Sequence, residues 1–173
     1  MTKRTIPDTI SEEEIVEILK HTKNPQHRAA FYLGFYQGMR VSEVAKLTQE
    51  NIDKQSHLIK IKQAKGSKDR HIPIVKPILL SNNTIFQILK QIPIKIGIRA
   101  IQYAFKNKAK RVLKKDIHFH TLRHSGATWL LNKKKWDIRQ VQRFLGHSKI
   151  QTTEIYTHVS PEDLINLEWG EPK

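Results

Sequence analysis

The hydrophobic pattern of this chain changes period near its middle, and that change limits the folds open to it. Apolar residues recur at helical spacing early in the chain, for instance over residues 15–19, and again in its second half. Residues 58–62 and 71–75 are instead short, β-branched and partly alternating, which predicts two strands. Residues 65–69 are rich in turn formers and predict the connection between them. We therefore predict a mainly α (α+β) fold, a helical domain with a small antiparallel β-hairpin or sheet.

Signals at the ends of these segments sharpen the prediction. Ser11 followed by Glu14 resembles a capping box, Asp137 is an expected N-cap, and Pro73 places the second strand at a sheet edge. No repeat or linker divides the chain, so we expect one domain over residues 1–173. Helices are expected after Ser11, over 26–37 with Gly38 near its end, after Arg40 through Leu47, near 83–91, 98–112, 121–131 and 137–144, and from Ser160.

The charge balance gives the first indication of function. Lys plus Arg total 31 and Asp plus Glu total 16, which leaves a net charge of +15. An excess of this size predicts binding to a polyanion, with double-stranded DNA as the leading candidate. A solvated basic surface is the alternative, and basic ribosomal or membrane-surface proteins share this composition. The residues we expect to contact DNA phosphates are Lys106, Lys108, Lys110, Arg111, Lys114, Lys115, Lys133, Lys134 and Lys135.

Several classes of protein are disfavoured by what the sequence lacks. It contains no cysteine, so a disulfide framework, a thiolate metal site and a cysteine nucleophile are excluded. The first residues do not form a signal peptide, and no stretch is apolar enough for a membrane span. We expect a cytoplasmic protein that has no membrane partner and is associated with the nucleoid of a prokaryote or with DNA in a virus-infected host cell.

Residues able to perform chemistry lie in four segments. These are Gly-Met-Arg-Val-Ser-Glu at 38–43, Lys-Gly-Ser-Lys-Asp-Arg at 65–70, His-Thr-Leu-Arg-His at 120–124, and Leu-Gly-His at 145–147, which Tyr156 follows. Taken singly, each has an ordinary structural explanation, such as a surface contact or a rim aromatic. Taken together, they fit reactions at a phosphodiester.

The chemistry of those residue types explains the fit. Two arginines can clamp the non-bridging oxygens of a phosphate and offset the charge of the transition state. A phenol needs a nearby base or cation before it can attack. A lysine can protonate the leaving alkoxide, and histidines can move protons or donate to the phosphate. No carboxylate cluster suggests a two-metal nuclease.

With these motifs in their order, the chain resembles the tyrosine recombinase (phage integrase) family over nearly all of its length. The 38–43 segment looks like the first arginine box of that family, and 65–70 looks like its lysine hairpin. The 120–124 segment looks like the His-x-Leu-Arg-His box. The resemblance implies the catalytic residues Arg40, Lys65, His120, Arg123, His147 and the nucleophile Tyr156, with Glu43 and His124 in support.

The resemblance also implies how such a protein would work. Tyr156 would attack the scissile phosphate and form a 3′-phosphotyrosyl bond, and a 5′-hydroxyl from a partner duplex would then resolve it. Neither metal, ATP nor any other cofactor is implied. Family members act as homo-tetramers on paired DNA sites, and a monomer is the expected state without DNA.

Two departures from the family pattern concern the ends of the chain. Family members usually add an N-terminal, helical core-binding (SAM-like) domain, which we expect to be absent here, whether the chain is a fragment or a minimal version. The segment after Tyr156 is short. Its apolar residues Leu164, Leu167 and Trp169 could dock on a neighbouring subunit or pack on their own domain.

Other functions and sites stay open at this stage. A DNA-binding regulator or accessory factor on the same fold would not exchange strands, and a type IB topoisomerase would relax DNA rather than recombine it. His118, His120 and His124 have spacings that a metal could use. The adjacent arginines would repel a cation, so we expect no metal site.

Overall fold

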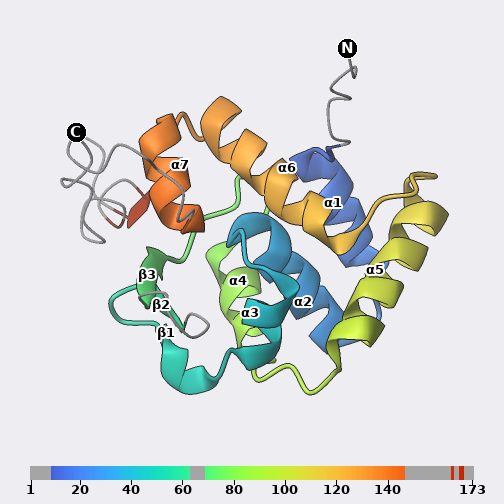
Figure 1. The fold of residues 1–173 in the computed structure, drawn as a ribbon, viewed down its shortest axis with the longest axis horizontal. Helices are drawn as coiled ribbons and strands as arrows, with labels where there is room; N and C mark the ends of the chain where they lie inside the picture. The colour runs from blue at the N-terminus through green and yellow to red at the C-terminus, as the bar shows by residue number, and fades with distance from the viewer. Residues whose placement is uncertain (1–8, 63–68, 147–164, 166–167, 170–173) are drawn as a thin grey trace, which may run out of the picture.

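The computed structural model describes residues 9–62, 69–146, 165, 168 and 169. Within these residues it is mainly helical with one small sheet, which confirms the predicted fold class. In Figure 1 the sheet and α7 lie toward one end of the molecule, and α5 lies toward the other. The elements are α1 (Glu12–Lys20), α2 (Pro25–Tyr36), α3 (Val41–Lys46), the 3-10 helix η1 (Gln49–Asn51), β1 (Ile52–Asp53), β2 (Leu58–Ile61), β3 (Arg70–Pro73), α4 (Asn82–Leu89), α5 (Ile98–Val112), α6 (Phe119–Asn132) and α7 (Ile138–Leu145).

Helices α1, α2, α4 and α7 begin where a short polar side chain accepts from one of the first N–H groups of the helix. Ser11 forms the predicted capping box with Glu14 at the start of α1. Asn24 caps α2, where Pro25 occupies the first turn. Asp137 caps α7 as predicted. These caps explain why α1, α2 and α7 start within a few residues of the expected positions.

The sheet has three strands rather than the predicted two. β2 pairs antiparallel with β3, and Lys60 of β2 lies opposite His71 of β3. This pairing confirms the predicted hairpin. The short strand β1 adds to the other side of β2, with Ile52 opposite Ile59. Because the order is β1-β2-β3, Pro73 lies on an edge strand, as expected. β1 was missed because alternation needs four or more residues to be recognised, and β1 has two.

Helix α2 forms the centre of the core, packed among the other helices (Figure 1). Its aromatic residues Phe31, Tyr32, Phe35 and Tyr36 are all completely buried. α6 crosses α2 so closely that a Cβ atom at Gly126 would collide with the backbone carbonyl of Phe35. Glycine at this position therefore sets the distance between α2 and α6, the helix that carries three predicted site residues, His120, Arg123 and His124.

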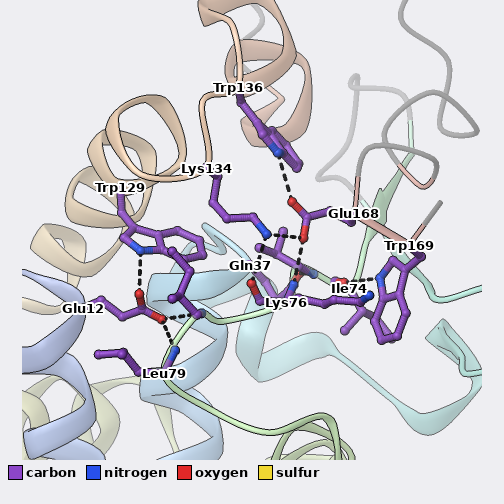
Figure 2. Close-up of polar contacts among 12 residues, drawn as sticks. Glu12, Gln37, Ile74, Lys76, Leu79, Trp129, Lys134, Trp136, Glu168 and Trp169 are labelled. Carbon is purple, nitrogen blue, oxygen red and sulfur yellow. Dashed lines mark hydrogen bonds and ion pairs between the residues drawn. The ribbon is translucent and has the colours of Figure 1, made fainter. Parts of the chain in front are cut away.

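A buried carboxylate joins α1 to three other parts of the molecule (Figure 2). Glu12 accepts from the Trp129 indole at 2.9 Å and from the Tyr36 hydroxyl at 3.2 Å. It also accepts from the backbone N–H groups of Ile78 and Leu79, at 2.7 and 3.1 Å. One side chain thus ties together α1, α2, α6 and the segment that leads into α4.

A second buried carboxylate links residues 168 and 169 to the rest of the domain (Figure 2). Glu168 accepts from the Trp136 indole and the Lys76 N–H, both at 3.0 Å, and pairs with Lys134. Beside it, the Trp169 indole donates to the Ile74 carbonyl. Trp169 therefore packs on its own domain, the second of the two alternatives for this residue. Leu164, Leu167, and most of the helix expected from Ser160 lie outside the described residues.

Among the described residues, no helix is both long and apolar enough to cross a membrane.

Candidate active site

Arg40 stands at the junction of α2 and α3, where the chain reverses sharply. Gly38 adopts a positive φ of 57° just after α2 ends. A Cβ at that position would also collide with the Leu145 side chain. Arg40 then serves as the N-cap of α3, and its backbone N–H donates to Glu43 Oε2 at 2.8 Å. This turn leaves the Arg40 side chain partly exposed, at 41%.

Glu43 is a buried carboxylate shared by two guanidinium groups. Arg40 Nη1 lies 3.2 Å from its Oε1. Arg70 contacts both oxygens, Nη1 to Oε1 at 2.9 Å and Nη2 to Oε2 at 3.2 Å. Burial alone would raise the pKa of Glu43, but the hydrogen bonds and charge of Arg70 outweigh it and lower the pKa. Glu43 is therefore ionised at neutral pH.

Arg123 enters from α6 and is almost completely buried. It donates from Nη1 to the Gly38 carbonyl and from Nη2 to the Leu145 carbonyl at 2.9 Å. Leu145 ends α7, where the carbonyls carry the negative end of the helix dipole. Burial, followed by the charge of Arg40, lowers the pKa of Arg123 to about 10. Arg123 keeps its positive charge at neutral pH. Its hydrogen bonds link the 120–124 motif to the first residues of the 38–43 and 145–147 motifs.

His120 and His124 lie one turn apart on the exposed face of α6. Their rings are 4.5 Å apart and perpendicular. Partial burial, followed by the charges of His124, Arg123 and Arg40, lowers the pKa of His120. An ordinary histidine titrates near 6.5, so His120 is mostly neutral at physiological pH and can accept a proton.

The structure thus brings together four predicted residues from two motifs: Arg40 and Glu43 of the 38–43 segment, and His120 and Arg123 of the 120–124 segment, with His124 adjacent. Each is close enough to at least one of the others to form a hydrogen bond with it or to shift its pKa. Lys65, His147 and Tyr156 lie outside the described residues, and their place in the site stays a prediction.

Arg70 is a site residue that sequence reasoning missed. It is the last residue of the 65–70 motif, but its spacing suggests only the start of a strand. In the structure it is 11% exposed, and its Nε also donates to the Phe144 carbonyl at 3.2 Å. The signal that could have found it is a charged residue entering a strand next to the proposed lysine turn.

The predicted DNA-contacting residues lie in varied surroundings. Three pair with a carboxylate: Lys106 with Asp116, Lys115 with Glu14 and Lys134 with Glu168. Two donate to backbone carbonyls: Lys108 to that of His21 and Lys114 to that of Arg111. The exposed remainder are Lys110, Arg111, Lys133 and Lys135. Their contacts with DNA stay a prediction.

Within the described ranges, no three His, Asp or Glu residues are grouped so as to hold a metal ion.

The model of the phage integrase family matches residues 8–163. The chain belongs to this family. A tyrosine recombinase of Thermosipho africanus is 34% identical to this phage integrase family chain. The match covers 93% of this chain and 60% of the length of the Thermosipho protein. The chain spans about 60% of the length of the curated relatives it matches.

Solved structures show that the fold is shared with other members. An integrase from mycobacterium phage Brujita superposes with a TM-score of 0.76 at 21% identity, over 96% of this chain and 58% of its own. A lambda integrase tetramer bound to a Holliday junction superposes with a TM-score of 0.67 at 18% identity, over 87% of this chain and 50% of its own. At these identities the likeness concerns the fold alone.

Proposed function

We propose that this chain is the catalytic domain of a site-specific DNA recombinase that breaks and rejoins strands through a 3′-phosphotyrosyl intermediate. The observation that carries the proposal is the convergence of Arg40, Arg123 and His120 in a member of the phage integrase family. Two guanidinium groups from distant parts of the chain lie close enough to the His120 imidazole for their charges to lower its pKa. Phosphoryl transfer needs such a set of groups.

Each proposed residue has one task in the cleavage step. The Tyr156 phenol oxygen attacks the phosphorus, and the bond from phosphorus to the 5′-oxygen breaks. Arg40 and Arg123 bind the non-bridging oxygens and stabilise the developing charge. Lys65 gives a proton to the leaving 5′-oxygen, while His120 and His147 move protons or donate to the phosphate. The energy of the phosphodiester is kept in the new bond, so the step requires neither ATP nor a metal ion.

The second step and the assembly follow from the same chemistry. A 5′-hydroxyl from a partner duplex attacks the phosphotyrosyl bond and releases Tyr156. Exchange between two duplexes requires paired sites, and we propose a homo-tetramer on DNA. The lambda integrase tetramer on a Holliday junction, which shares this fold, supports that arrangement. We place the reaction in the cytoplasm, on nucleoid DNA or on the DNA of an infecting virus.

Covalent capture tests the proposal directly. The wild-type protein and Tyr156→Phe are incubated with nicked suicide duplexes that contain a randomised core, and SDS-resistant adducts are isolated and sequenced. We expect an adduct with the wild type alone, since the variant lacks only the attacking oxygen. Both proteins should bind DNA with affinity that falls steeply as salt rises, because phosphate contacts release counterions.

Each result has a definite meaning. An adduct formed by Tyr156→Phe would refute the assignment of the nucleophile. Salt-dependent binding without any wild-type adduct would refute strand cleavage by this chain and favour a DNA-binding regulator. A product that is relaxed rather than recombined would favour a topoisomerase.

A further inference from the structure

Arg70 and Arg40 share Glu43 unequally. Arg70 grips both carboxylate oxygens, at 2.9 and 3.2 Å, while the Arg40 side chain makes one contact at 3.2 Å. The two side chains are also exposed differently, 11% for Arg70 and 41% for Arg40. A two-point guanidinium–carboxylate contact is both stronger and more rigid than a single one. Arg70 is therefore the main partner of Glu43, and Arg40 remains open toward the solvent side.

The path of the Arg70 side chain is built into the fold. Its Nε donates to the Phe144 carbonyl near the end of α7. Gly146 ends that helix with a φ of 69°, and a Cβ there would lie 2.8 Å from Arg70 Cδ. The glycine of the Leu-Gly-His motif thus leaves the space that Arg70 occupies. β3, α3 and the end of α7 meet through this one side chain.

Removing Arg70 would change what Glu43 does to Arg40. Among the described residues, Arg40 would become the one guanidinium in hydrogen-bond contact with the buried carboxylate. An ionised, buried carboxylate strongly requires a cationic partner. It would then compete with a DNA phosphate for Arg40.

We propose that Arg70 is a positioning residue of this site. The two hydrogen bonds from its guanidinium to the Glu43 carboxylate, called the clamp below, hold Glu43, so that Arg40 stays available to bind the scissile phosphate. This inference rests on the proposed function for the role of Arg40. The clamp itself is a property of the folded protein and can be tested without any reaction.

The first test follows the Glu43 carboxyl by carbon-13 NMR titration in the wild type, Arg70→Gln, Arg70→Lys and Lys60→Gln. Lys60 lies on neighbouring β2, pairs with Asp69 at 3.6 Å, and is the matched control. Burial raises the pKa of Glu43 and Arg70 lowers it, so Arg70→Gln should move the titration to higher pH. Lys60→Gln should leave it in place. An unchanged titration in Arg70→Gln would overturn the clamp. If that variant does not fold, Arg70→Lys should show a smaller shift in the same direction, and no shift there would overturn it equally.

The second test is a double-mutant cycle on the rate of covalent attachment to a suicide duplex. Arg70→Gln should slow attachment at least about ten-fold, as expected when a charge-assisted phosphate contact is lost. Combined with Glu43→Gln, the same change should cost almost nothing further, because no carboxylate then competes for Arg40. Losses that multiply would show that Arg70 does not act through Glu43 and would overturn the proposal. If wild-type protein forms no adduct, the proposed function fails while the titration still decides the clamp.

Discussion

Replacing Glu12 by leucine should destabilise this domain strongly, although Glu12 lies outside the candidate site. The carboxylate accepts four hydrogen bonds from three other parts of the molecule. Leucine has a similar volume but accepts none, so all four donors would lose their partner at once. The site is affected indirectly, because Trp129 stands on α6 together with His120 and Arg123.

The size of the effect can be worked out from the exposure of the donors. Trp129 and Tyr36 are 4% and 0% exposed, so water cannot replace the carboxylate there. Each such orphaned donor costs about 1–3 kcal/mol. Ile78 and Leu79 are exposed, and water can satisfy their N–H groups. The added apolar surface of leucine offsets about 1 kcal/mol. We expect a net loss of about 3 kcal/mol in the free energy of unfolding, which corresponds to roughly 6–12 °C in Tm for a chain of this size.

The assay is urea and thermal unfolding of Glu12→Leu beside Glu13→Leu. Glu13 is the matched control because it is exposed in the same first turn of α1. Both variants lose one negative charge near the helix N-terminus, so that contribution cancels. A difference between the two variants below about 0.5 kcal/mol would refute the hydrogen-bond reasoning, since surface changes already fall in that range.

Three further predictions concern packing, docking and pH. Gly126→Ala should cost roughly 2–3 kcal/mol in urea unfolding, because its methyl group meets the Phe35 carbonyl; a neutral result would contradict the close helix contact. Glu168→Ala should lower the urea midpoint by leaving the buried Trp136 indole without an acceptor, at about 1–3 kcal/mol; an unchanged midpoint would mean that the docked C-terminal residues do not stabilise the domain. The pKa of His120 is lowered in the folded state, so the folded state binds fewer protons than the unfolded one. Stability should therefore decline as pH falls below about 6.5, and less so in His120→Gln; identical pH profiles of Tm would refute this.

Those parts of the fold that depend on local pattern could be predicted from the sequence. The helix over 98–112 was predicted with its observed bounds, because apolar and charged residues alternate there at helical spacing over four turns. The hairpin was predicted from its β-branched segments. β1 was not, because two residues have no period and the strand exists only through its pairing with β2.

The candidate site divides in the same way. Arg40, His120 and Arg123 could be named as candidates from the sequence because they belong to motifs, which are local. The contacts of Arg70 with Glu43 and Phe144 were not, because the three residues are separated by 27 and 74 positions and meet only in the folded chain. The hydrogen bond from the Trp136 indole to Glu168 also joins residues that are distant in the sequence. The role of a buried carboxylate can be recognised only once its hydrogen-bond donors are known.

The sharing of Glu43 has a consequence for how sequences of this kind can diverge. A carboxylate at 43 without an arginine at 70 would sequester Arg40. An arginine at 70 without the carboxylate would be a largely buried charge with no counter-ion among its described contacts. We therefore expect a change at 43 or at 70 alone to be disfavoured more strongly than a change at both. We expect relatives to keep or lose the two residues as a pair, with glycine at 146 retained wherever the arginine is retained. An alignment of such relatives would reveal this covariation without any experiment on the protein itself.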